Sequence, residues 1–87
     1  MTVSTDPAAI RDAVRVYVLE TFLPGEDPAA LTDSTALIGG RIVDSLGLLK
    51  LVTFLEERYG IEIAAHEADA DHFDTIEEIT ALVRSKL

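Results

Sequence analysis

Apolar residues recur at the three- and four-residue steps of an amphipathic helix in three stretches of the chain. The first stretch follows Asp6-Pro7, in which an N-capping residue precedes a proline at the first helical position. Pro24-Gly25 ends the pattern. We therefore predict a helix from Pro7 to about Phe22, whose buried face consists of Ile10, Ala13, Val14, Tyr17, Val18 and Phe22.

The strongest helical pattern lies in the middle of the chain. Asp44-Ser45-Leu46 opens it, it runs to Tyr59, and Gly60 is placed to end it as a C-cap. The stripe expected to face the core consists of Leu48, Leu51, Val52, Leu55 and Tyr59. The other side of this helix is expected to carry Ser45, Leu46, Leu49, Lys50, Thr53, Glu56 and Glu57.

A third helix is predicted at the end of the chain, because Thr75 and Glu78 have the spacing of a capping box. Its inward positions are Ile76, Ile79, Leu82, Val83 and Leu87. Before it, residues 61–63 alternate over too short a span to separate a strand from an extended segment. Residues 64–74 are acidic and irregular, with one helical turn expected near Asp69–Phe73. The fold class predicted is all-α: a small four-helix bundle of three main helices and one short helix.

The connection between the first two helices, residues 24–43, is unusually long. Prolines and glycines interrupt it, yet it also carries the apolar residues Leu31, Leu37, Ile38, Ile42 and Val43. We expect these residues to pack onto the core. At about 20 residues the segment exceeds an ordinary connection, and such loops are often functional.

Composition narrows the class of protein. The 87 residues suit one domain, with a core expected over about residues 8–85. Sixteen acidic and seven basic residues give a net charge of −9, which disfavours binding to nucleic acid or anionic lipid. The absence of cysteine excludes disulfides, thiolate metal sites and cysteine nucleophiles.

No apolar run approaches the roughly 18–20 residues of a membrane span, and the N-terminus lacks the basic and apolar regions of a secretory signal. We therefore expect a cytoplasmic monomer. Residues 62–78 hold seven acids and no Lys or Arg. Two interpretations of this segment stay open: it keeps the protein soluble, or it docks basic partners by electrostatic attraction.

Three chemical sites can be set aside. Asp69, Asp71 and Asp74 have part of the spacing of a calcium loop, but its fifth and twelfth positions hold Phe73 and Thr80. His66 and His72 lie six residues apart in an acidic segment, and solvated side chains explain them better than a metal. Ser45 lacks the G-x-S-x-G elbow and the triad partners of a hydrolase.

Ser45 is nevertheless the residue that stands out. One interpretation is structural, since Asp44-Ser45 is a favourable helix start. The other is that the Ser45 hydroxyl is a point of covalent attachment. A phosphodiester there would lie near unpaired N–H groups at the positive end of the helix dipole. Asp44 could then help to bind a divalent ion shared with the modifying enzyme.

The run from Val43 to Ile63 contains D-S-L followed at the family's separation by L-E-E-R-Y-G-I-E-I. It resembles the phosphopantetheine attachment region of acyl and peptidyl carrier proteins. A long first loop precedes it and a capped final helix follows, so the likeness extends from about Ala8 to Val83. The chain resembles a free-standing carrier more than a module of a larger synthase.

The resemblance implies that Ser45 receives 4′-phosphopantetheine from coenzyme A through a phosphopantetheinyl transferase. A ligase, adenylation enzyme or acyltransferase would load cargo as a thioester, and a synthase would receive it. The carrier would catalyse nothing itself. Partner recognition is implied for the helix that begins at Ser45, at Leu46, Leu49, Lys50, Glu56 and Glu57.

Three positions depart from the pattern of the family. Gly47 and Lys50 stand where fatty-acid carriers tend to have acids, which favours an aminoacyl or short acyl cargo in polyketide or nonribosomal peptide biosynthesis. Phe54 is larger than expected, and is either part of the core or a wall of the cargo pocket. The alternatives are a D-alanyl carrier, a fatty-acyl carrier, or an acidic helical adaptor that is not modified.

Overall fold

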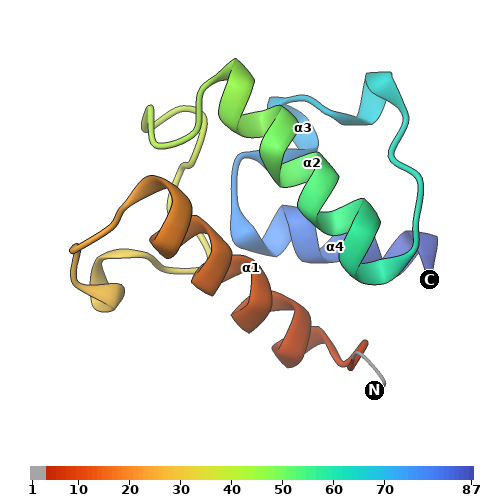
Figure 1. Cartoon of the computed structure of the whole chain (residues 1–87), viewed down its shortest axis with the longest axis horizontal. Helices are drawn as coiled ribbons and strands as arrows, with labels where there is room; N and C mark the ends of the chain where they lie inside the picture. The colour runs from red at the N-terminus through yellow and green to blue at the C-terminus, as the bar shows by residue number, and fades with distance from the viewer. Residues whose placement is uncertain (1–3) are drawn as a thin grey trace.

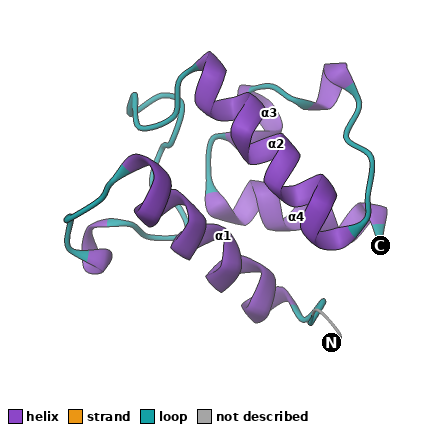
Figure 2. Ribbon diagram, in the orientation of Figure 1, coloured by secondary structure: helices purple, strands orange, loops and turns teal. Residues whose placement is uncertain are grey.

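The computed structural model describes residues 4–87. Four α-helices and two 3₁₀ turns are present, and residues 4–87 contain no strand (Figures 1 and 2). This confirms the predicted all-α fold. In chain order the elements are α1 (Pro7–Phe22), η1 (Pro28–Ala30), α2 (Ser45–Tyr59), η2 (Ala65–Glu67), α3 (Ala70–Phe73) and α4 (Ile76–Lys86).

The two ends of α2 lie where their capping residues predict. The Asp44 carboxylate accepts a hydrogen bond of 2.7 Å from the Gly47 amide. Gly60 adopts the left-handed conformation, with φ of 64°, and its N–H donates to the carbonyl of Glu56. These two caps end the helix at both sides and place Ser45 at its first position.

At the start of α1 and of α4, the predicted capping hydrogen bonds are absent or form only in part. α1 begins at Pro7 as predicted, but the Asp6 side chain makes no capping hydrogen bond. At the start of α4 the Thr75 hydroxyl oxygen accepts from the Glu78 amide at 3.1 Å. The Glu78 carboxylate accepts from the Thr75 hydroxyl and not from its backbone, so only half of the predicted capping box forms.

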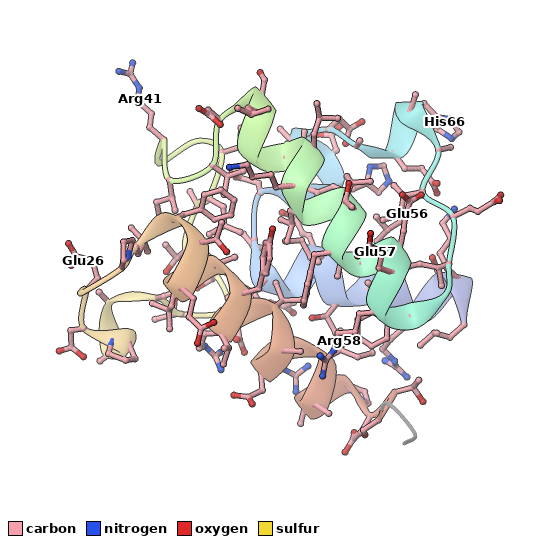
Figure 3. All side chains as sticks on the ribbon, viewed as in Figure 1. Glu26, Arg41, Glu56, Glu57, Arg58 and His66 are labelled. Atoms are coloured by element: carbon pink, nitrogen blue, oxygen red, sulfur yellow. The ribbon has the colours of Figure 1, made fainter. Side chains whose placement is uncertain are left out.

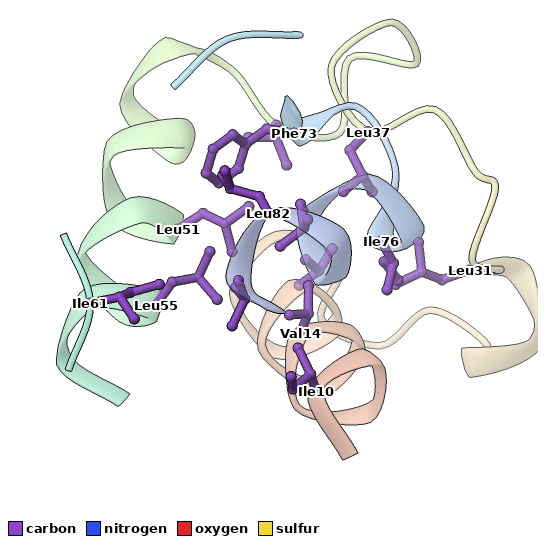
Figure 4. Close-up of a cluster of buried hydrophobic side chains, with 14 residues drawn as sticks. Ile10, Val14, Leu31, Leu37, Leu51, Leu55, Ile61, Phe73, Ile76 and Leu82 are labelled. Atoms are coloured by element: carbon purple, nitrogen blue, oxygen red, sulfur yellow. The ribbon is translucent and has the colours of Figure 1, made fainter. Parts of the chain in front are cut away.

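The core lies between α1, α2 and α4, and α3 closes one end (Figures 1 and 4). α4 packs against both α1 and α3. One prediction for α4 was wrong: Leu87 is 54% exposed, because it follows the last helical residue, Lys86. The buried apolar cluster consists of Ile10, Val14, Val18, Leu31, Leu37, Val43, Leu51, Leu55, Ile61, Phe73, Ile76, Ile79, Leu82 and Val83.

The long connection packs onto this core as expected. Leu31, Leu37 and Val43 are buried, and Ile38 and Ile42 are partly buried against the same cluster. Polar contacts also hold the segment. Asp33 forms ion pairs with Arg15 and, at 3.6 Å, with Arg11, both on α1.

Residues 61–74 form no strand. Ile61 is buried, and the Ile63 amide donates to the Glu56 carboxylate at 3.0 Å, so this segment is extended and is held by a side chain. The expected helical turn is α3, which Asp69 caps. The turn η2 was not predicted. No helix within residues 4–87 has the length and apolar character needed to cross a bilayer.

Candidate functional site

Ser45 is exposed at the first position of α2. Asp44 precedes it and is occupied by the helix start: its carboxylate accepts from Gly47, and its carbonyl accepts from the Leu48 amide at 2.8 Å. The helix therefore begins without help from the Ser45 side chain. As a result, the Ser45 hydroxyl lies on the surface at the amino end of a capped helix.

A surface cavity of about 440 Å³ lies beside Ser45. Its walls come from three segments: the end of the long connection, the first turn of α2, and the start of α3. Most of the lining residues are apolar, and Arg41 and Asp44 are the two charged residues among them. The lining residues are Ile38, Arg41, Val43, Asp44, Ser45, Leu48 and Ala70.

The connection makes a tight turn just before α2. A Cβ atom at Gly40 would collide with the carbonyl oxygen of Ala36, so this position requires glycine. Arg41 has a φ of 62°, a left-handed conformation that costs a non-glycine residue about 1–2 kcal/mol. Its side chain is exposed and extends away from the body of the protein (Figure 3).

Asp74, between α3 and α4, holds this turn. Its carboxylate oxygen Oδ1 accepts from the amides of Ile38 and Gly39, each at 2.9 Å. Its carbonyl oxygen accepts from the Leu37 amide at 2.6 Å. The sequence does not indicate this role, since the spacing of Asp74 suggests only a partial calcium loop. No local pattern could have revealed it, because the side-chain partners lie 36 and 35 residues away.

The outer surface of α2 carries most of the residues that the sequence assigned to recognition. Leu46 and Leu49 are 63% and 62% exposed, the two highest values among the large apolar residues of the described chain. Lys50 and Glu57 are also exposed. Together these four residues form an outer face that starts beside Ser45.

Glu56 differs from its neighbour Glu57. Its carboxylate accepts from the Ile63 amide at 3.0 Å and so joins the middle of α2 to the segment that follows it. The Glu57 side chain is exposed, and Figure 3 shows the two residues side by side on α2. Of the two acids, Glu57 is therefore the more accessible to a partner, whereas Glu56 is partly buried and bonded within the fold.

Gly47 is buried and lies against α1. A Cβ atom at this position would lie 2.7 Å from Cε1 of Phe22 and 3.1 Å from Oδ1 of Asp44. Such distances require the neighbours to move. The structure therefore gives a packing reason for the glycine at position 47.

Phe54 packs between α1 and α2. Its ring stacks on that of Tyr17, with centroids 4.2 Å apart and an angle of 15°, and the Tyr17 hydroxyl donates to the Lys50 carbonyl at 3.2 Å. Phe54 is not among the residues that line the cavity beside Ser45. Packing at the edge of the core agrees with the structure, and Phe54 also lines two other surface cavities, which residues of α1 and α2 form.

Much of the acidic segment is engaged within the fold. Glu67 pairs with Lys86, whose hydrogen bond lowers the pKa of the Glu67 carboxyl. Asp69 and His72 share a 2.8 Å contact, which lowers the pKa of Asp69 and raises that of His72. Residues 4–87 contain no cluster of three or more His, Cys, Asp or Glu side chains arranged to hold a metal ion.

Comparison with known proteins adds no relative. No family model matches the sequence, and no curated protein matches it either.

Proposed function

We propose that this chain is a carrier protein that holds an acyl or aminoacyl intermediate as a thioester on 4′-phosphopantetheine attached to Ser45. One observation carries the proposal. The serine of the D-S-L motif is exposed at the start of a capped helix, beside a mostly apolar cavity of about 440 Å³. An ordinary helix-start serine needs neither the cavity nor the exposed apolar face that follows it.

The residues around Ser45 fit the prosthetic group. Asp44 already caps α2, so modification of the Ser45 hydroxyl removes no contact that the helix start needs. The first-turn amides of a helix favour a phosphate, and the cavity offers apolar walls from Ile38, Val43 and Leu48 beside the attachment point. When bound, the group supplies the thiol that carries the cargo, and the chain has no cysteine to compete with it.

Attachment is a transfer reaction on the Ser45 oxygen. Oγ of Ser45 attacks the phosphorus that bears pantetheine in coenzyme A, and a phosphodiester bond forms as the pyrophosphate bond breaks. Adenosine 3′,5′-bisphosphate leaves, and a base of the phosphopantetheinyl transferase takes the hydroxyl proton. The carrier contributes an accessible nucleophile held by a rigid helix.

The outer face of α2 is the proposed docking surface for the transferase, the loading ligase or acyltransferase, and the synthase. Leu46 and Leu49 offer exposed apolar side chains next to Ser45, and such anchors contribute strongly when a partner buries them. Lys50 and Glu57 offer one charge of each sign. This mixed surface suits a dedicated set of partners in polyketide or nonribosomal peptide biosynthesis, with an aminoacyl or short acyl cargo, in the cytoplasm.

The test is the mass of the intact protein after incubation with coenzyme A, Mg²⁺ and a phosphopantetheinyl transferase of broad specificity. We expect a gain of one phosphopantetheine, and no gain for Ser45→Ala. The variant should keep its stability within about 0.5 kcal/mol, because its hydroxyl is exposed and Asp44 caps the helix. If several transferases fail to modify a folded wild-type sample, the chain is an unmodified helical adaptor.

A further inference from the structure

The structure links Asp74 to the attachment serine through a short series of backbone contacts. Asp74 accepts three hydrogen bonds from backbone amides. Its carbonyl oxygen accepts from Leu37, and its carboxylate accepts from Ile38 and Gly39. Hydrogen bonds to a carboxylate are stronger than those between neutral groups, so the turn is fastened at its first half.

The second half of the turn is fastened through Leu37. The carbonyl oxygen of Leu37 accepts from the amides of Ile42 and Val43, at 2.8 and 3.0 Å. Leu37 and Val43 are both buried, so this closure is anchored in the core. Val43 is followed directly by Asp44, which caps α2, and by Ser45, the first residue of the helix, so the closed turn leads straight into the helix start.

The same contacts set the relative position of two cavity walls. Ile38 belongs to the turn and Ala70 belongs to α3, and both line the cavity beside Ser45. Asp74 follows directly after α3 and bonds to the Ile38 amide. The contact with Asp74 therefore joins the wall formed by the turn to the wall formed by α3.

We propose that Asp74 is a positioning residue for modification of Ser45: its carboxylate holds the turn at residues 37–43 and thereby the orientation of the serine at the start of α2. This inference rests on the proposed carrier function. Asp74 does not touch the Ser45 hydroxyl, and it acts through Leu37 and Val43.

The chain offers a matched control in Asp33. Asp33 also anchors the long connection, but its side chain bonds to Arg11 and Arg15 on α1 and makes no contact with the turn. Asp33→Ala and Asp74→Ala each remove one negative charge and one anchor of the same segment. Asp74→Asn removes the charge and keeps a side-chain oxygen that can accept the hydrogen bonds from the Ile38 and Gly39 amides. Asp74→Ser is a milder change that cannot reach both amides.

Two measurements are made on each full-length variant at a temperature where all are folded. The first is amide hydrogen exchange, by NMR, over residues 37–46. The second is the rate of Ser45 modification from coenzyme A by a phosphopantetheinyl transferase, resolved into kcat and KM for the carrier. A loss of general stability would not change these kinetic constants in a sample that stays folded.

We expect Asp74→Ala to lose exchange protection at Ile38, Gly39, Ile42 and Val43, and to lower kcat about ten-fold with little change in KM, since a small misplacement of a reacting group costs rate. KM should hold because the outer face of α2 is unaltered. Asp74→Asn should recover most of the rate, and Asp33→Ala should keep the wild-type values. If Asp74→Ala does not fold, Asp74→Ser should show the same changes to a smaller extent.

The proposal is overturned if Asp74→Ala is modified at the wild-type kcat, or if Asp33→Ala slows modification equally. Failure of the carrier function has a different result, because wild type itself is then not modified. In that case the role in modification fails with the carrier function, and the exchange data report only on the turn: lost protection confined to residues 37–46 in Asp74→Ala shows that Asp74 holds the turn, and unchanged protection at Ile42 and Val43 shows that it does not.

Discussion

Gly47 of α2 lies directly against the ring of Phe22 of α1. A Cβ atom at Gly47 would come within 2.7 Å of Phe22 Cε1, so the Phe22 ring occupies the space that a side chain at this position would need. This contact between Gly47 and the Phe22 ring lies two residues after Ser45. A position that in the sequence suggests a difference in partner recognition is therefore a packing position.

Gly47→Glu should destabilise the protein by about 1–3 kcal/mol, because the new side chain must displace Phe22. Denaturant unfolding measures the change. Lys50→Glu is the matched control, since it adds an acid at an exposed position of the same helix and should change stability by less than about 0.5 kcal/mol. A Gly47→Glu variant as stable as wild type would contradict the packing role.

The hydroxyl group of Tyr59 lowers the stability of the folded protein. The oxygen is buried and has no hydrogen-bond partner within the described part of the chain. Tyr59→Phe removes this group and keeps the ring, so we expect a gain in stability of about 1 kcal/mol. Urea denaturation of the two proteins measures it. A loss of stability in Tyr59→Phe would show that the hydroxyl is hydrogen-bonded in solution.

The neighbouring acids Glu56 and Glu57 should contribute differently to the stability of the protein. Glu56→Ala leaves the Ile63 amide without its acceptor, and should cost about 1–2 kcal/mol. Glu57→Ala removes an exposed carboxylate, and should leave the melting temperature nearly unchanged. Thermal unfolding of both variants decides the matter, and equal losses in the two would contradict this assignment.

The contact between Asp69 and His72 should make stability depend on pH. The contact raises the pKa of His72 in the folded protein, so its contribution is fully present below the ordinary histidine pKa of about 6.5 and is lost as the pH rises through the raised value. It also lowers the pKa of Asp69, so the contribution is lost again in acid as the pH falls through that lowered value.

His72→Gln tests this dependence. We expect the melting temperature of the variant to fall below that of wild type in mildly acidic buffer and to approach it in mildly alkaline buffer. His66→Gln is the control, because His66 is exposed and forms no ion pair within residues 4–87. A constant difference between His72→Gln and wild type across this range would show that the pair does not stabilise the fold.

The helices could be predicted because their signals are local. Asp44 and Gly60 bracket α2 as expected, and Ile10, Val14 and Val18 face the core at the spacing that defined the first helix. The candidate serine could also be found in this way, since its motif is contiguous in the sequence.

Two features of the structure could not be predicted from the sequence, each for its own physical reason. Leu87 has the right spacing for the buried face of α4, but no helix remains around it to hold it there. Glu56 and Glu57 have the same chemistry and adjacent positions, and only the path of residues 61–63 beside α2 distinguishes them. A pattern along one helix cannot show which segment packs beside it.

The periodicity of apolar residues and the capping residues settled the three long helices, where each of them begins and the place of Ser45, because each of these depends on contacts within a few residues. The tertiary structure decided the surroundings of that serine. The hydrogen bonds of Asp74 to the turn, the contact of Gly47 with Phe22 and the cavity between the turn and α3 all join segments far apart in the chain. Such contacts form only when the helices pack, and local sequence patterns carry no record of them.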